Sequence, residues 1–318
     1  MIFFSALLAQ LLHMALMLAA APVLIGAIRL VKARLLGRRG PPLLQPWRDI
    51  FRLLRKQPVL ADGASIVFRA APFVSLAATA AAAALVPSFA LGMALGPVSD
   101  LLVIAGLLGL ARGATALAGM DVGTAFGGIG SSREMTFSVY AEPAFLLVIF
   151  TLTLLAGSTN LDVIATLLHD GALGLRASLG LVLVALLTVA LAENGRIPVD
   201  NPATHLELTM VHEAMVLEYS GRDLALIEAG TALKLLVWLS LIAAIFTPIG
   251  VAPSFALLAW PLGVASWIVK ISLLALALAA FETSIAKMRV FRVPEFLGIA
   301  LLLGLLAAVF LFVSTGIV

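Results

Sequence analysis

Long apolar segments dominate the chain and are separated by shorter polar ones. Segments of about 18 or more apolar residues with few charges are typical of membrane-spanning helices. Eight are present, at about residues 3–28, 71–94, 100–119, 139–157, 175–193, 229–248, 258–281 and 296–317. They are continuous and rich in Leu and Ala rather than alternating, which favours helices over a transmembrane barrel. We therefore predict an all-α, polytopic membrane protein with about eight spans in a single integral membrane domain, residues 1–318.

The first span has an alternative interpretation as a secretory signal peptide cleaved near residues 19–21. No Lys or Arg precedes it, and its apolar stretch is about twice the usual length of a signal-peptide core. We expect it to be retained as a span.

Basic residues are concentrated in alternate loops. The segments at about 31–70, 120–138, 194–228 and 282–295 carry most of the Lys and Arg, including the run KARLLGRR. The positive-inside rule predicts that these loops face the cytoplasm and that both termini lie outside. This topology accounts for the net charge of +3, so we expect a lipid bilayer rather than nucleic acid as the surrounding partner.

Two of the predicted cytoplasmic loops contain amphipathic segments. RRGPPLLQPWRDIFRLLRKQPV predicts a short helix, which would anchor in lipid headgroups or support a cytoplasmic subunit. The residues near its apolar face are Leu43, Ile50, Leu53 and Leu54. Arg48 and Asp49 lie on this helix and are candidate docking residues. A second interfacial helix is predicted from about residue 203, whereas the Gly-rich GTAFGGIGSS (123–132) is predicted to be a turn between spans.

Metal and thiol chemistry find little support in the chain. It has no cysteine, so it supplies no thiolate for an iron–sulfur cluster, disulfide or nucleophile. His205 and His212 are seven residues apart, about 10 Å along a helix, which is too far for simple chelation of one ion. We predict no metal site in this chain.

Ionisable residues inside the spans carry the strongest functional prediction. Each costs about 2.5–3.5 kcal/mol on insertion scales and therefore needs a partner or a purpose. Arg112 keeps its proton, so a carboxylate or carbonyl must face it, and Lys270 is either paired or deprotonated. Snorkelling at the interface would account for Glu228, Glu282 and Lys234, and we favour it for Glu282. The alternative is a proton path from the cytoplasmic side, with candidates Arg112, Glu142, Glu193, Glu228, Lys234 and Lys270.

The third predicted cytoplasmic loop carries the most specific pattern. It has the form AExxRxPxDxPxxxxEL followed by EYSG at residues 218–221. The pattern is formed by Ala192, Glu193, Arg196, Pro198, Asp200, Pro202, Glu207 and Leu208. Arg133 lies nine residues before Glu142. In these features the chain resembles the eight-span family that includes the quinone-site membrane subunit of respiratory complex I. Ala203 and His205 stand where complex I has glutamates, and the loop is similar to that of the branch found in group 4 membrane-bound nickel–iron (NiFe) hydrogenases, the formate hydrogenlyase and hydrogenase-4 type.

The resemblance implies a function, partners and further site residues. It implies a non-redox membrane subunit of a bacterial or archaeal cytoplasmic membrane, which anchors a hydrogenase arm and links electron transfer to proton translocation. Its implied partners are the hydrogenase large and small subunits, a ferredoxin-like iron–sulfur subunit and an antiporter-like membrane subunit. The nickel–iron and iron–sulfur centres would lie in those partners, with no cofactor in this chain.

The resemblance also assigns residues in the loop. It adds Glu207, Glu213 and Glu218 to the proton path and makes the loop a docking surface, with candidates Arg133, Arg196, Asp200, His205 and His212. Arg196 and Asp200 have an alternative structural role as a pair across a Pro-flanked turn. A quinone-site subunit of NADH:quinone oxidoreductase and a stand-alone ion transporter are the alternative functions.

Overall fold

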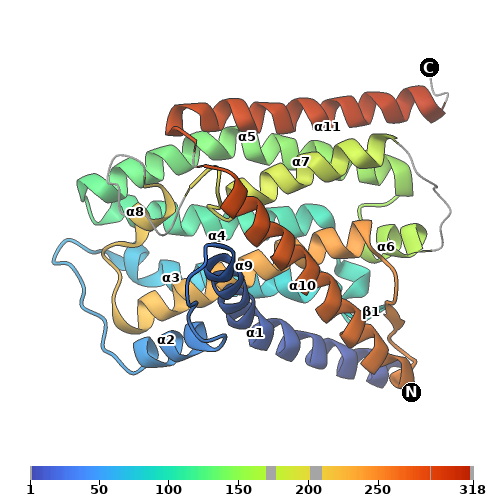
Figure 1. Ribbon diagram of the computed structural model, residues 1–318, viewed down its shortest axis with the longest axis horizontal. Coiled ribbons are helices and arrows are strands. Elements are labelled where there is room, and N and C mark those ends of the chain that lie inside the picture. Colours follow the sequence, from blue (N-terminus) through green and yellow to red (C-terminus); the bar gives the residue numbers. More distant parts are fainter. Residues whose placement is uncertain (1, 170–176, 201–209, 287, 316–318) are drawn as a thin grey trace.

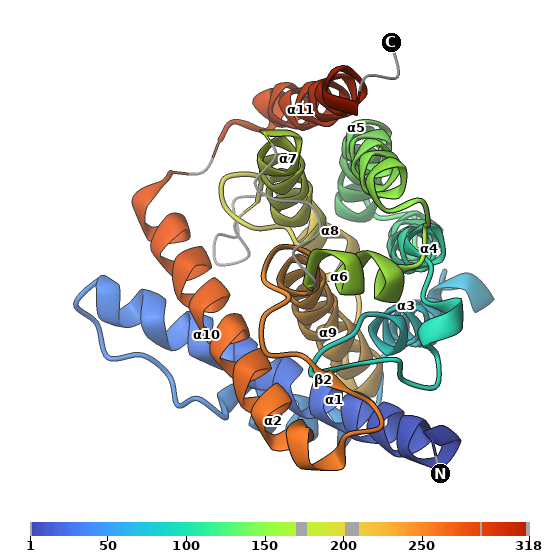
Figure 2. The same cartoon turned by 90° about the vertical axis from the view of Figure 1, so that its right-hand side faces the viewer.

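The protein is a bundle of long helices, shown in Figures 1 and 2. The computed structural model describes residues 2–169, 177–200, 210–286 and 288–315. Within these ranges, seven helices are long and apolar enough to cross a membrane. They are α1 (Ile2–Leu35), α3 (Ile66–Leu85), α4 (Leu101–Asp121), α5 (Ala125–Ala156), α9 (Gly221–Phe246), α10 (Trp260–Ser284) and α11 (Val293–Thr315). The predicted fifth span is the shorter α7 (Ala177–Glu193), and its expected first residues lie outside the described ranges. The prediction of an all-α polytopic fold is confirmed.

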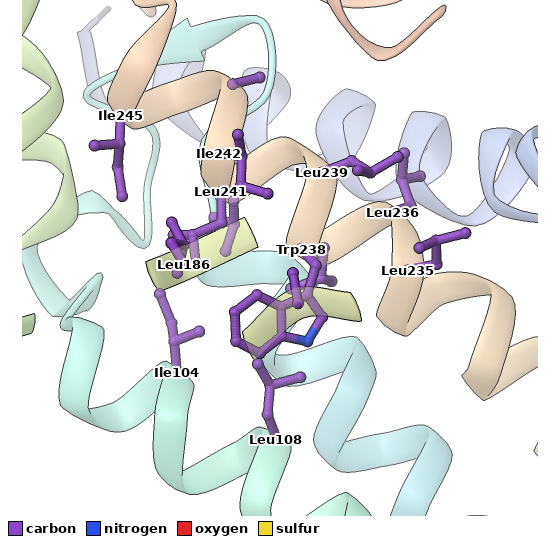
Figure 3. Close-up of a cluster of buried hydrophobic side chains, with 14 of the residues drawn as sticks. Ile104, Leu108, Leu186, Leu235, Leu236, Trp238, Leu239, Leu241, Ile242 and Ile245 are labelled. Atoms are coloured by element: carbon purple, nitrogen blue, oxygen red, sulfur yellow. The ribbon is translucent and has the colours of Figure 1, made fainter. Parts of the chain in front are cut away.

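The helix α9 forms the centre of the bundle. In its most apolar window, 78% of the residues are buried, twice the share in α3, α4 or α5. Figure 3 shows its side chains packed against Ile104 and Leu108 of α4 and Leu186 of α7, with Trp238 directed toward Leu108. A helix that is apolar on all sides can be buried in this way. The part of α9 from Ala232 to Ile245 therefore lies almost entirely inside the protein.

The two ends of the bundle differ. One end, which we call the basic end, holds α2 (Gln45–Leu54), α8 (His212–Val216) and the loops around residues 36–65 and 194–200. The start of α1 and the end of α11 both lie at the opposite end in Figure 1. There, β1 (Ala90–Leu91) pairs in parallel with β2 (Ala252–Pro253), and α6 (Leu161–His169) lies between α5 and α7 in the sequence.

The predicted amphipathic helix of the first loop is confirmed as α2. Its Ile50 is buried, whereas Leu43 just before it and Leu54 at its end are exposed. The first residues of the helix predicted from about residue 203 lie outside the described residues, and within its described part α8 is helical.

The predicted turn at GTAFGGIGSS is wrong. The helix α5 begins at Ala125, where the Thr124 hydroxyl accepts a hydrogen bond from the Gly127 amide. A Cβ at Gly127 would lie 2.1 Å from the carbonyl oxygen of Gly119, and one at Gly130 would lie 2.8 Å from that of Val211. These glycines permit close helix packing rather than a turn.

The span predicted to continue to residue 94 also ends early. The helix α3 stops at Leu85, just before Val86 and Pro87, and the chain then runs into β1. Since proline removes a backbone donor and disfavours a helical residue before it, Pro87 accounts for this end.

Candidate functional site

A buried arginine joins three helices in the middle of the bundle. Arg112 on α4 has a side chain that is 5% exposed. Its terminal nitrogens bond the carboxylates of Glu193 on α7 and Glu142 on α5. Its Nε lies 3.9 Å from Oε1 of Glu134, also on α5. A carboxylate or a carbonyl was predicted to face Arg112, and three carboxylates do so.

Lys234 extends this cluster to the central helix. Its Nζ lies 3.0 Å from Oε2 of Glu193, and its side chain is only 13% exposed. Of the two interpretations of Lys234, this contact rules out snorkelling to the interface, because the lysine is directed to a buried carboxylate. A buried ion pair compensates for part of the cost of removing both charges from water.

His212 extends the cluster in the other direction, toward the basic end. Its Nε2 lies 3.3 Å from Oε2 of Glu134, and its Nδ1 lies 3.6 Å from Oδ2 of Asp200. The same Asp200 oxygen accepts hydrogen bonds from the backbone amides of Val211 and His212 at 3.3 Å. Burial opposes protonation of the imidazole, but the two carboxylates outweigh it, so the pKa of His212 is raised above its ordinary value.

A glycine allows His212 to lie there. Gly195 has φ of +55°, and a Cβ on it would come within 2.7 Å of the His212 Nδ1 atom. The backbone conformation and the imidazole both require a residue without a side chain. The AENG segment therefore shapes the entrance of the cluster.

These groups form one continuous series, which we call the charge chain. In order from the basic end inward it comprises Asp200, His212, Glu134, Arg112, Glu193 and Lys234, with Glu142 branching from Arg112. Every neighbouring pair lies within 4.0 Å, the limit for an ion pair when the imidazole is protonated. Carboxylates and imidazole can each accept and release a proton, whereas the Arg112 guanidinium between them keeps its charge.

A second, smaller cluster lies at the basic end. Oε2 of Glu282 lies 2.8 Å from Nζ of Lys32, and its Oε1 lies 3.6 Å from a terminal nitrogen of Arg196. The Glu282 side chain is 1% exposed, so the snorkelling predicted for it is wrong. Packing of α1 against α10 encloses this carboxylate and places two cations beside it. Arg196 and Asp200 were proposed above as a structural pair. The Arg196 side chain instead lies beside Glu282, and the Asp200 side chain lies beside His212.

A cavity of about 380 Å³ adjoins the charge chain between α4, α5, α7 and α9. Its lining includes Leu102, Gly106, Arg112, Glu142, Glu193 and Trp238. Leu102 and Leu146 at its edge are 49% and 47% exposed, so the cavity opens on the side of the bundle. Among the described residues, no group of three or more His, Asp or Glu side chains is arranged to hold a metal ion.

The remaining predicted residues lie apart from the charge chain. Lys270 lines a small cavity near Ser88, and the described part of the chain gives it no hydrogen bond or ion pair. Glu218 and Glu228 are exposed, and Glu213 is half-buried on α8. Their predicted roles in a proton path stay predictions. His205 and Glu207 lie outside the described residues.

The predicted docking residues at the basic end have varied settings. Arg133 donates to the carbonyl of Met210 at 2.9 Å, which ties α5 to the segment before α8. Asp49 accepts a hydrogen bond from Arg52 at 2.9 Å, and Arg48 is exposed on α2. The His212 side chain points into the charge chain, so a docking role alone does not describe its position.

The EYSG segment has a clear structural role. The Tyr219 ring stacks on Phe68 with centroids 3.9 Å apart, and its hydroxyl donates to the Phe68 carbonyl at 2.7 Å. The Ser220 hydroxyl accepts from the Val59 amide at 2.8 Å. Gly221, with φ of +54°, lets the chain approach the Gln57 carbonyl, where a Cβ would lie 2.5 Å away. The motif thus fastens the first loop to the start of α9.

Sequence reasoning missed Glu134. It lies beside Arg133 in a stretch interpreted as part of a loop, so its carboxylate was not counted among the intramembrane charges. The spacing of Glu134 and Glu142, eight residues or about two helical turns apart, places both on one face of a helix. That spacing becomes informative once the Gly-rich segment is recognised as helical.

The fold and the charge chain together define a class of protein: an integral membrane subunit with a buried series of charges leading from one end to mid-bundle. The chain belongs to the NADH dehydrogenase family, which it matches over residues 7–313.

Named relatives lie on both branches of this family. Formate hydrogenlyase subunit 4 of Escherichia coli (strain K12) is 35% identical over 277 residues, covering 87% of this chain and 89% of that protein. Hydrogenase-4 component C of the same organism is 34% identical, covering 91% and 90%. NADH-ubiquinone oxidoreductase chain 1 of Triticum aestivum is 29% identical, covering 71% and 72%. The resemblance inferred from the loop motif is confirmed.

A solved structure shares the fold. A chain of the membrane-bound sulfane sulfur reductase, an archaeal respiratory membrane complex, superposes with a TM-score of 0.80 at 19% identity, covering 96% of this chain and 98% of that one. The two chains therefore share this fold over nearly their whole length.

Proposed function

We propose that this protein is the membrane subunit of a membrane-bound nickel–iron hydrogenase of the formate hydrogenlyase or hydrogenase-4 type. It anchors the hydrogenase arm at the basic end and links electron transfer to proton movement. The observation that carries the proposal is the charge chain, which starts at the loop motif shared with the hydrogenase branch and ends at Lys234 on the central helix. The similarity to formate hydrogenlyase subunit 4 supports the same assignment.

The order of groups in the charge chain allows a change of charge at the docking loop to affect groups deeper in the bundle. His212 is the histidine of the charge chain, with its pKa raised by the carboxylates that it contacts on both sides. A change in its charge alters the field on Glu134 and, through Arg112, on Glu193 and Lys234. In the proposed function, a redox step in the docked arm shifts this balance and moves a proton inward.

The proposal places the redox centres in other chains. This chain has no cysteine and supplies no thiolate ligands, so nickel–iron and iron–sulfur centres would be held by hydrogenase large and small subunits and a ferredoxin-like subunit. An antiporter-like membrane subunit would complete proton translocation. The concentration of Lys and Arg at the basic end supports a cytoplasmic location for it, with both termini outside.

The first test is purification of the intact complex. The protein is tagged, extracted in mild detergent, and its co-purifying chains are identified by mass spectrometry. Recovery of a nickel–iron large subunit with hydrogen-evolving activity is expected. Recovery of NADH-oxidising and quinone-reducing subunits in its place would overturn the proposal in favour of a complex I type subunit, the alternative that similarity to the wheat protein supports.

The second test concerns coupling. In inverted membrane vesicles, the Glu193→Gln variant keeps a hydrogen-bonding side chain but removes the carboxylate between Arg112 and Lys234. We expect hydrogen evolution by the arm to persist while proton uptake per hydrogen molecule falls severalfold. The matched control is Glu295→Gln, at an exposed carboxylate in the first turn of α11. Equal proton uptake in both variants would refute a role for the charge chain.

A further inference from the structure

The Glu142 carboxylate occupies an unusual position for a charge. The residue lies near the middle of α5, roughly 26 Å from its first residue and 21 Å from its last at 1.5 Å per residue. Its side chain is nevertheless 58% exposed, whereas the Arg112 side chain that it bonds is 5% exposed. A carboxylate open to hydrocarbon at this depth is strongly disfavoured. In the membrane, another molecule must cover it.

The neighbouring face of α4 is bare. Gly106, Gly109 and Gly113 follow the spacing of one helix face, and the first two line the same cavity. A Cβ built on Gly106 or Gly113 would meet no atom within 4 Å, and one on Gly109 would meet only the Glu142 carboxylate, at 3.9 Å. The glycines at Gly119, Gly127 and Gly130, by contrast, are filled by this chain's own helices. The bare glycines therefore satisfy no packing need within the chain.

The acidic side chains of the charge chain beside this groove outnumber the cationic ones. With His212 protonated, the charge chain contains three cationic and four acidic side chains, and with His212 and Asp200 both set aside it contains two and three. Either way one negative charge remains, and Glu142 is its most exposed member. A lipid tail would cover the groove but would neither donate a hydrogen bond nor supply a positive charge.

We propose that the groove between α4 and α5 is the docking site for a membrane-spanning helix of a partner subunit. That helix places small residues against Gly106 and Gly113 and directs a lysine or arginine toward Glu142. Small residues on both partners permit the close approach that drives helix association in membranes. Figure 2 shows α5, α4 and α3 along one side of the bundle with α9 behind them, so a helix can approach from this side. The proposal rests on the proposed function only in requiring a multisubunit membrane complex.

Glycine substitutions test the packing. Gly106→Leu and Gly113→Leu fill space that the chain itself leaves open, so its own folding is expected to be preserved. Gly180→Leu on α7 and Gly298→Leu on α11 are matched controls, because a Cβ at either position also meets nothing within 4 Å. We expect the α4 variants to lose a membrane partner severalfold in the tagged purification while the controls retain it. Full retention by the α4 variants would overturn the proposal.

Photocrosslinking identifies the occupant. A benzophenone amino acid replaces Leu102 at the edge of the groove, with the same change at Leu302, 58% exposed on α11, as control. The expected adduct, specific to position 102, joins an apolar membrane segment of another subunit with a Lys or Arg inside that segment. Adducts only with lipid, a quinone or a second copy of this chain would overturn the proposal. Absence of hydrogenase from a complex that still gives the expected adduct would refute the proposed function alone.

Discussion

Loss of the Arg112 side chain is the most informative perturbation of this structure. Arg112→Met keeps the length of the apolar stem but leaves Glu193 with Lys234 alone and Glu142 and Glu134 without their shared cation. Removing one partner of a buried ion pair costs about 3–5 kcal/mol, because the remaining charge stays desolvated. At about 2 °C per kcal/mol for a chain of this size, the expected fall in Tm is roughly 6–10 °C.

The matched control is an exposed pair of the same chemistry. Arg52 bonds Asp49 on α2, with its side chain 67% exposed, and such a pair contributes about 0–1 kcal/mol. Arg52→Met should therefore shift Tm by about 2 °C or less. Both variants are compared by tryptophan fluorescence during heating in mild detergent. Equal shifts in the two variants would show that burial of Arg112 has no energetic consequence.

A second variant separates lost charge balance from lost packing. In Arg112→Met combined with Glu193→Gln, the uncompensated carboxylate is removed together with its cation. Since the two residues are in direct contact, their effects should be non-additive, with a coupling of about 1–3 kcal/mol. If the double variant is destabilised by the sum of the single changes, the arginine acts through its packing and the electrostatic argument is wrong.

Three further predictions address the loops at the basic end. Because the pKa of His212 is raised in the folded state, its contribution to stability is present below about pH 6.5 and is lost as pH rises through the raised pKa. The fall in Tm from about pH 6 to 9 should therefore be smaller in His212→Gln than in wild type, and an unchanged slope would contradict this. Tyr219→Phe keeps the stacking on Phe68 but loses the hydrogen bond of the hydroxyl, so it should lower the free energy of unfolding by about 1 kcal/mol. Denaturant titration against wild type measures this change, and a loss of several kcal/mol would refute the assignment. Gly130→Val, whose Cβ would lie 2.8 Å from the Val211 carbonyl, should speed proteolysis near residue 211, whereas Gly128→Val, with no atom within 4 Å, should not.

The charge chain shows why the loop motif and the intramembrane charges belong together. Asp200 and Glu193 come from the same motif, yet they lie on opposite sides of Arg112 in the charge chain. Glu193 contacts Arg112 directly, whereas Asp200 is connected to it through His212 and Glu134. Arg196, a third member of the motif, turns to Glu282 and holds α10 at the basic end. The motif therefore has one part that positions helices and another that contributes titratable groups.

Several features followed directly from the amino-acid sequence. The helical nature of the long apolar segments and the amphipathic α2 depend on local composition. The need for a carboxylate or carbonyl facing Arg112 depends on the cost of an unpaired charge in the membrane. The family also followed, because the loop motif is contiguous. Glu134 and the start of α5 did not, since a Gly-rich segment is typical of turns unless packing against other helices requires its glycines.

The tertiary structure alone decided which charges meet. Arg112 is 81 residues from Glu193 and 30 from Glu142 in the sequence, and Lys234 reaches Glu193 only because α9 lies at the centre of the bundle. Lys234 and Glu282 looked like interfacial residues from their places near span ends, but helix packing enclosed both. Hydrophobic periodicity defines which segments are buried, whereas the direction of each buried side chain depends on how neighbouring helices pack against it.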